Sequence, residues 1–319
     1  MKKKLICIVG PTAVGKTDIA LEIGKKIGAE LISCDSRQVY KGLDIGTGKL
    51  PGGEVGFERH EKYWEIDGVK VWMYDVCEAQ QRYDVWQYVQ DVGLILDDIE
   101  DRNSVPIFVG GTGLYLRGIL DGFAHMEIPV DHSLREELET FSLENLQKRL
   151  AELNDEQFQM MNNSEKNNKR RLIRKIEIQI LRDKPRNQTF VTGIKNEYEI
   201  LKIGICAPRE LLYQRIDERV VRRVEAGMIE EAEYIVKKMG VSIDRLRELG
   251  LEYGMLADYL EGKFGSKGEF IEKLQFKIHQ YAKRQLTWFQ KEKDILWFDI
   301  TKPDFKRKVE DYVFAWYNE

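Results

Sequence analysis

The sequence predicts an α/β protein with a parallel central sheet flanked by helices and interrupted by an all-helical insertion. Short apolar runs typical of buried strands alternate with helical patterns in the first third of the chain. Strand patterns then disappear between residues 125 and 185 and return near residue 200. We therefore expect a core formed by residues 1–124 and 186–319, and a helical insertion formed by residues 125–185.

The chain opens with a strand, a glycine-containing loop and a helix. Lys4–Val9 is a short, mostly apolar run, as expected for a strand buried on both faces of a parallel sheet. Apolar residues recur at helical spacing over Thr17–Gly28, and Gly28 is well placed to end that helix. The opening apolar run is too short for a secretory leader, and no stretch approaches the roughly 20 apolar residues of a membrane span.

The following elements alternate between strand and helix. Strands are predicted at Leu31–Cys34, Val71–Tyr74 and Val105–Val109, with a helix over Asp84–Glu100 before the last of them. A small extra hairpin is expected around Asp67-Gly68. This succession is typical of a doubly wound sheet.

The second half of the core is expected to be mainly helical. Strand character returns at Ile200–Ile205 and Ile295–Phe298. One long charged helix is predicted over Arg209–Met239 and another over Glu269–Lys291, and Gly262–Gly268 is typical of a loop. Within the insertion, leucines recur at helical spacing.

Composition narrows the class of protein. The chain has 319 residues, 43% of them apolar, which is enough to bury a large core without disulfides or metal ions. Its four cysteines are scattered and form no Cys-x-x-Cys pair, as expected for reduced thiols. With a net charge of −4, any nucleic acid must be held by a local basic surface. We expect a cytoplasmic monomer that does not bind membranes.

Between the first strand and the first helix lies a Gly-x4-Gly-Lys-Thr sequence, Gly10–Thr17, which is typical of phosphate binding. Glycines let the backbone wrap an anion, Lys16 supplies a cation, and the Thr17 hydroxyl can ligate Mg²⁺. The core is therefore expected to be P-loop NTPase-like. The residues predicted to hold phosphate or diphosphate are Gly10, Thr12, Ala13, Val14, Gly15, Lys16 and Thr17.

An acid that organises Mg²⁺ in an ATPase is missing from its usual place. The strand Val105–Val109 ends in Gly110-Gly111-Thr112-Gly113, with no carboxylate. Asp35 follows Leu31–Cys34 and would emerge at the same sheet edge as the phosphate loop. Asp35 could organise a metal ion, act as a general base, or only shape a turn.

Several blocks in order along the chain resemble tRNA dimethylallyltransferases of the bacterial type. The blocks are Gly10–Thr17, Asp35–Thr47, Val109–Tyr115, Ile128–Asp131, Leu134-Arg135, Arg171–Glu177 and Ala282–Trp288. The resemblance implies transfer of the dimethylallyl group of dimethylallyl diphosphate to the exocyclic amine of the adenosine 3′ of the anticodon. It also implies that Asp35 is the base, that Thr112 binds the adenine and that Arg219 is an additional cation for diphosphate. Arg219 could instead belong to a solvated helix face.

The expected partner of the insertion is the tRNA anticodon stem-loop. Nine positive and two negative residues lie between Lys166 and Asn187, a local net charge of +7. Such a run is often only a solvated face, but it suits phosphate contacts. The residues predicted to contact tRNA are Asp35, Ser36, Arg37, Gln38, Thr112, Arg135, Arg170, Arg171, Arg174, Lys283, Arg284 and Gln285.

Two departures from the family pattern and two other functions stay open. The hairpin segment Trp64–Asp75 replaces a His-His-Leu-Ile-Asp type segment, and Gly250–Tyr253 replaces a Gly-Tyr-Lys/Arg run. The alternatives are an adenylate isopentenyltransferase of the cytokinin type, which would share the loop and Asp35, and a P-loop NTP-dependent kinase or ATPase. Transfer to tRNA, transfer to AMP and ATP turnover would distinguish the three.

Overall fold

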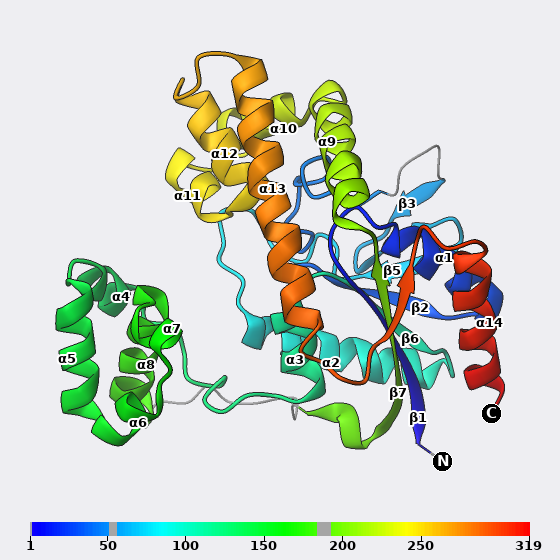
Figure 1. Cartoon of the computed structure of the whole chain (residues 1–319), viewed down its shortest axis with the longest axis horizontal. Coiled ribbons are helices and arrows are strands. Elements are labelled where there is room, and N and C mark those ends of the chain that lie inside the picture. Colours follow the sequence, from blue (N-terminus) through cyan, green and yellow to red (C-terminus); the bar gives the residue numbers. More distant parts are fainter. Residues whose placement is uncertain (1, 51–55, 184–192) are drawn as a thin grey trace. The chain divides into compact units, whose positions relative to one another are not determined.

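A computed structural model describes residues 2–50, 56–183 and 193–319 (Figure 1). Its strands are β1 (Lys3–Val9), β2 (Glu30–Cys34), β3 (Phe57–Arg59), β4 (Tyr63–Ile66), β5 (Val69–Trp72), β6 (Pro106–Gly110), β7 (Tyr198–Cys206) and β8 (Leu296–Asp299). Its longer helices are α1 (Lys16–Ile27), α2 (Val85–Asp101), α3 (Gly113–Leu120), α4 (His132–Glu139), α5 (Leu143–Leu153), α8 (Lys169–Leu181), α9 (Arg209–Glu225), α10 (Met228–Lys237), α12 (Leu251–Leu260), α13 (Lys267–Phe289) and α14 (Phe305–Asn318). Shorter helices are α6 (Asp155–Met160), α7 (Asn163–Lys166), α11 (Ile243–Glu248) and the 3₁₀ turn η1 (Ile194–Asn196).

The described strands form one sheet in the order β3-β4-β5-β2-β6-β1-β7-β8. The six strands from β5 to β8 in this order are parallel, and β3 and β4 are added antiparallel at one edge. Strand β1 lies between β6 and β7, with Ile6 opposite both Ile107 and Leu201. The carboxyl ends of β1, β6 and β2 are therefore neighbours. The predicted α/β fold with a mostly parallel sheet is confirmed.

The predicted hairpin is present and extends the sheet. Strands β4 and β5 are joined through Asp67 and Gly68, which both have positive φ values, 52° and 78°. This is the conformation of the two-residue turn that matches strand twist. The strand predicted at Val71–Tyr74 lies two residues earlier, because Met73 has φ 67° and leaves the extended conformation.

One predicted helix is wrong in extent. The segment Arg209–Met239 contains two helices, α9 and α10, rather than one. The break is at Gly227, whose φ of 101° no α-helix can accommodate. The predicted loop Gly262–Gly268 also ends early, because the Ser266 side chain accepts a hydrogen bond from the Glu269 N–H and α13 begins at Lys267.

The chain divides into two compact units, Met1–Asp121 with Thr192–Glu319, and Gly122–Val191. The first unit contains the whole described sheet. In it, α9 and α13 pack against each other, and α14 packs on α1 (Figure 1). The second unit contains α4 to α8 and is entirely helical where it is described.

The helical unit has a core of its own. Its fully or nearly buried apolar residues come from α4, α5 and α8 and from the segment after α6: Leu138, Leu146, Leu150, Met161, Leu172, Ile173 and Ile176. The leucine spacing in the sequence predicted that this segment is helical. No helix in the described part of the chain is long and apolar enough to cross a bilayer.

Candidate active site

The phosphate loop joins β1 to α1 with an unusual backbone. Gly10 has φ 137°, and a Cβ there would lie 2.2 Å from the Ile205 carbonyl oxygen on the neighbouring strand. Ala13 and Gly15 also have positive φ values, 66° and 83°, and Gly15 is the residue that precedes the first turn of α1. Left-handed residues in a loop before a helix turn successive N–H groups toward one point, which forms an anion site.

Helix α9 supplies three arginines along one face toward two loops. Arg215 Nε donates to the Ala13 carbonyl at 2.8 Å, and the Arg219 guanidinium donates to Thr12 Oγ1 at 2.8 Å. One turn further, Arg223 donates to the Gly46 carbonyl at 2.7 Å. The spacing of four residues places all three on the same side of the helix. The structure therefore brings Arg219 to the phosphate loop, rather than to a solvated face.

Lys16 and Arg219, two cations at the phosphate loop, both have a pKa that is lowered by burial. Burial, reinforced by the nearby Arg219, lowers the pKa of Lys16 to about 7, and Asp35 only partly opposes this. Burial and the neighbouring Arg223 lower the pKa of Arg219 to about 9. Both groups would be stabilised in their charged form by a bound anion. The electrostatics of the loop thus favour a ligand with several negative charges.

Asp35 lies at the carboxyl end of β2, next to the loop that follows β6. Its Oδ1 accepts the Arg37 N–H at 2.9 Å, so part of its role is to shape a turn. The adjacent Ser36 N–H donates to Thr112 Oγ1 at 3.2 Å, and the Thr112 N–H donates to the Cys34 carbonyl at 3.0 Å. Asp35 and Thr112 are thus fixed beside each other.

One cleft in the first unit is lined by Lys16, Asp35 and Arg219 together. Its wall includes side chains from the phosphate loop, from the loop after β2, from α9, from α12 and from α13. The lining residues are Thr12, Lys16, Thr17, Asp35, Arg37, Gln38, Thr47, Gly48, Tyr74, Val109, Gly110, Gly111, Arg219, Leu251, Glu252, Tyr281 and Gln285. Anion-binding groups, two carboxylates and aromatic side chains therefore share one cleft.

Comparisons with known proteins identify the family of the chain. The family model described as IPP transferase matches residues 38–292. The chain belongs to the IPP transferase family. A second model, described as isopentenyl transferase, matches residues 3–69.

Curated relatives of this IPP transferase family member span nearly its whole length. The chain is 38% identical over 291 residues to tRNA dimethylallyltransferase 2 of Treponema denticola, covering 91% of this chain and 92% of that protein. It is 36% identical over 309 residues to the tRNA dimethylallyltransferase of Exiguobacterium sp., covering 96% and 93%. The resemblance found in the sequence blocks is confirmed.

Solved structures agree as well. The full-length tRNA isopentenylpyrophosphate transferase of Bacillus halodurans superposes with a TM-score of 0.69 at 30% identity, covering 98% of this chain and 96% of that one. The enzyme of Staphylococcus epidermidis gives 0.67 at 30% identity, with 99% of each chain covered. A eukaryotic dimethylallyltransferase acting on tRNA shares the fold, with a TM-score of 0.73 at 22% identity and coverage of 95% and 76%.

Gln285, which was predicted to contact tRNA, is mostly buried, lines the cleft and contacts two loops of the core. It is buried on α13, its Oε1 accepts the Thr12 N–H at 2.9 Å, and its Nε2 donates to the Gly111 carbonyl at 3.0 Å. It thereby ties the phosphate loop to the loop after β6. Its neighbours Lys283 and Arg284 are exposed.

Two other predicted tRNA contacts are engaged inside the protein. Arg37 Nε donates to the Leu249 carbonyl at 2.7 Å, and Gln38 Nε2 donates to the Gly48 carbonyl at 3.2 Å. Both side chains still line the cleft. They therefore shape its wall whatever else they contact.

On the helical unit, Glu177 binds the side chains of two arginines that were predicted to contact tRNA. This fully buried carboxylate accepts hydrogen bonds from Arg135 at 2.9 and 2.7 Å and from Arg174 at 2.5 Å. Arg174 also donates to the carbonyls of Ile128 and Pro129. Arg135 and Arg174 are internal links of this unit, which the count of positive charges could not show.

The rest of the basic run is divided between described and undescribed parts. Arg170 and Arg171 are exposed at the start of α8. Lys184 and Arg186 lie outside the described residues. The exposed charge that the structure describes on this helix is thus smaller than the sequence count.

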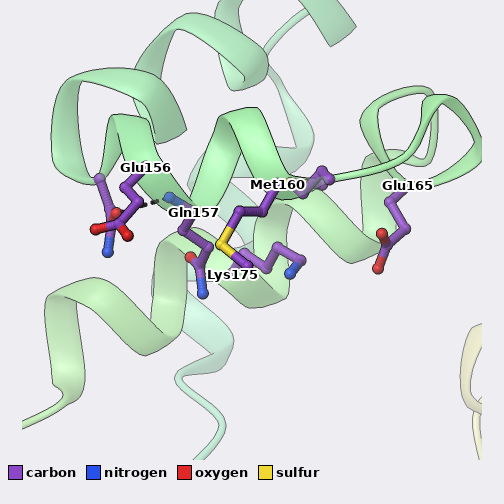
Figure 2. Close-up of a pocket in the computed structure, with 7 residues that line it drawn as sticks. Glu156, Gln157, Met160, Glu165 and Lys175 are labelled. Carbon is purple, nitrogen blue, oxygen red and sulfur yellow. Dashed lines mark hydrogen bonds between the residues drawn. The ribbon is translucent and has the colours of Figure 1, made fainter.

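The helical unit also has a shallow pocket of mixed charge (Figure 2). Glu156 and Met160 come from α6, Glu165 from α7 and Lys175 from α8. It contains two carboxylates and one ammonium group. This set does not match the cation-rich wall that a diphosphate needs.

The cleft is also lined by three residues that the sequence did not single out, Tyr74, Glu252 and Tyr281. Arg223 and Glu252 face each other, with Arg223 Nη1 and Glu252 Oε1 3.7 Å apart. Burial raises the pKa of the Tyr74 and Tyr281 hydroxyls, which are therefore neutral donors at physiological pH. Helical spacing of the arginines on α9 could have suggested Arg223, but nothing in the sequence pairs it with Glu252.

Proposed function

We propose that this protein is a tRNA dimethylallyltransferase, which transfers the dimethylallyl group of dimethylallyl diphosphate to the exocyclic amine of the adenosine 3′ of the anticodon. The observation that carries the proposal is the meeting of the phosphate loop, Arg219 and Asp35 in one cleft. Relatives that are 38% and 36% identical over more than nine tenths of the chain carry this name.

The first demand of the reaction is a departing diphosphate. The amine nitrogen attacks the allylic carbon, and the bond from that carbon to the diphosphate oxygen breaks with its electrons going to oxygen. Growing negative charge is then met by the loop amides, Lys16 and Arg219, which the fold holds in place before the substrate arrives. Their lowered pKa values match a site that is completed by an anion.

The second demand is removal of a proton from the amine. One oxygen of Asp35 accepts the Arg37 N–H, which fixes the carboxylate and leaves its other oxygen for the substrate. Thr112, held beside it by the Ser36 N–H, can bond the adenine edge. In this proposal Asp35 takes the proton and Thr112 orients the base.

Magnesium is the expected cofactor. The site fits it, because the Thr17 hydroxyl lines the cleft at the phosphate loop, and Mg²⁺ commonly uses one or two protein oxygens and completes its coordination with phosphates and water. No group of three or more potential metal ligands occurs in the described ranges, so the substrate would supply most ligands. Bound Mg²⁺ would neutralise charge on the diphosphate.

The tRNA would be held by exposed positive groups on both units. Arg170 and Arg171 on α8 and Lys283 and Arg284 on α13 are the exposed candidates. The adenine must be extruded from the anticodon loop, which costs a few kcal/mol that phosphate contacts offset. We propose that the enzyme works as a monomer in the cytoplasm.

Transfer to a free nucleotide is the second candidate function. It is supported by the match of residues 3–69 to the isopentenyl transferase model. It leaves the helical insertion without a role, whereas a tRNA substrate gives it one. A kinase is disfavoured because β6 ends in glycines rather than in a carboxylate.

The test is incubation of the full chain with radiolabelled dimethylallyl diphosphate, Mg²⁺ and either unmodified tRNA or AMP. We expect label in tRNA and not in AMP. Label in AMP alone would replace the proposal by the nucleotide prenyltransferase. ATP hydrolysis without any transfer of label would reject both.

A further inference from the structure

The cleft contains a second carboxylate besides Asp35, and the proposed reaction does not use it. Glu252, in the first turn of α12, is 9% exposed and lines the cleft. Its Oε1 is 3.7 Å from Arg223 Nη1, too far for a hydrogen bond but close enough for a strong charge interaction. Burial raises the pKa of Glu252, and Arg223 opposes this.

Arg223 also fixes the wall of the cleft. It donates to the Gly46 carbonyl at 2.7 Å, and a Cβ on Gly48 would lie 1.8 Å from Arg223 Nη2 and 3.0 Å from Arg219 Nη2. Both guanidinium groups therefore press against the same glycine. The segment is held from its other side by Glu231, which accepts the N–H groups of Asp44, Ile45 and Gly46 at 2.7–3.0 Å.

Charged neighbours act on Arg219 in opposite directions. Arg223 disfavours the charge on Arg219, while Glu252 and Asp35 favour it. A diphosphate bound at the loop would be attracted by Arg219 and Arg223 and repelled by Glu252. Repulsion of this kind weakens the hold on substrate and product alike, and it speeds the release of a highly charged product.

We infer that Glu252 and Arg223 form an opposed charge pair that sets how tightly the cleft holds diphosphate, with Glu252 as the group that limits the affinity. Neither residue transfers a proton or touches the reacting carbon, so both are positioning residues. The inference rests on the proposed function, because it assumes that diphosphate binds at the loop.

The test compares Glu252→Gln, Arg223→Gln and the double variant in the full chain, with inorganic pyrophosphate as the probe in titration calorimetry at pH 8. We expect Glu252→Gln to tighten binding on the order of tenfold, since one repelling charge is removed, and Arg223→Gln to weaken it by a similar factor. The double variant should bind with an affinity between those of the two single variants, and its departure from the sum of their effects measures the coupling between the two charges.

Glu261→Gln is the matched control, because it removes the same charge at the exposed C-terminal end of α12. It should leave pyrophosphate binding unchanged. In turnover of labelled dimethylallyl diphosphate with tRNA, Glu252→Gln should lower the multiple-turnover rate through slow release. Its single-turnover rate should not fall with the multiple-turnover rate, because the slowed step is release rather than transfer.

Weaker or unchanged pyrophosphate binding in Glu252→Gln would overturn the inference, and thermal unfolding of the same samples identifies loss of fold. If Arg223→Gln does not fold, the sign of the Glu252→Gln effect alone decides. If the parent protein itself fails to bind pyrophosphate, the proposed function fails at its first step and the inference falls with it.

Discussion

Asp35 is placed so that one change can separate catalysis from substrate binding. Its Oδ1 accepts the Arg37 N–H, and an asparagine can keep that bond while losing the ability to accept a proton. We expect Asp35→Asn to reduce single-turnover transfer by about 10²-fold or more, the usual contribution of a general base. Affinity for tRNA, measured by filter binding, should stay within about twofold. Lower affinity with normal turnover would make Asp35 a binding residue.

Lys16 should couple diphosphate binding to proton uptake. Because burial and Arg219 lower its pKa to about 7, this amine is mostly neutral above pH 7 in the free protein. A bound anion favours the ammonium form, so affinity for pyrophosphate should fall as pH rises above about 7. Calorimetry in buffers of different ionisation enthalpy should detect the uptake. In Lys16→Arg, which stays charged, the uptake should be smaller; equal uptake in both proteins would contradict this role.

Site residues that belong to a short, continuous sequence motif could be predicted. Lys16 and Thr17 follow from the phosphate loop, and Asp35 from its place after a buried run. The two loop contacts of Gln285 could not be predicted, because spacing along α13 does not reveal which face meets the loops. The pairing of Arg223 with Glu252 depends on how α9 and α12 meet, a contact between residues 29 apart that no local pattern records.

At the level of elements, α8 is tied to the preceding chain through one carboxylate. Burial alone would raise the pKa of Glu177, but hydrogen bonds from Arg135, Arg174 and the Asp131 N–H outweigh it and lower the pKa. The carboxylate therefore stabilises the unit above its ordinary pKa near 4.5, and this is lost as pH falls through the lower folded value.

We expect Glu177→Gln to destabilise this unit by about 1.5 kcal/mol, the low end for charged hydrogen bonds because both arginines are partly exposed. The six tryptophans all lie in the other unit, so hydrogen exchange over α4 and α8 is the suitable measurement. Glu139→Gln, an exposed change in α4, is the control. Unaltered exchange in Glu177→Gln would show that the arginines do not depend on this acid.

The start of α8 should act through tRNA phosphates. Reversing Arg170 and Arg171 to glutamate should weaken tRNA binding and reduce the slope of log K against log salt concentration by about 1.5, the share of two phosphate contacts. The same reversal at Lys148 and Arg149, exposed on α5, controls for net charge. An unchanged slope at α8 would remove these residues from the interface.

At the scale of the molecule, the helical unit leaves and re-enters the core at one place. The Gly193 N–H donates to the Ile119 carbonyl at 3.2 Å, and Lys195 pairs with Asp121 at 2.6 Å. Replacing residues 122–192 by a short Gly/Ser linker should thus leave the core folded and able to bind pyrophosphate within about threefold, while transfer to tRNA is lost. Retained transfer would show that the unit does not hold tRNA. Lost pyrophosphate binding would show that the core needs it.

The fold class could be predicted because the strands and helices of the core each leave a local pattern in the sequence, and these patterns alternate along the chain. The sequence placed the insertion at 125–185, whereas packing separates Gly122–Val191. The single helix predicted over Arg209–Met239 was wrong because the left-handed Gly227 outweighs the charged periodicity on both sides. Boundaries of this kind are decided by individual backbone angles and by contacts that form only after folding.

The two hydrogen bonds of Gln285 should couple the binding of the two substrates. One amide holds both the loop for diphosphate and the loop that carries Thr112, so ordering either loop restrains the other. Whichever substrate arrives first has then already met part of the conformational entropy cost for the second. Reciprocity requires the gain in affinity to be the same in both directions, so the two binding events would be cooperative.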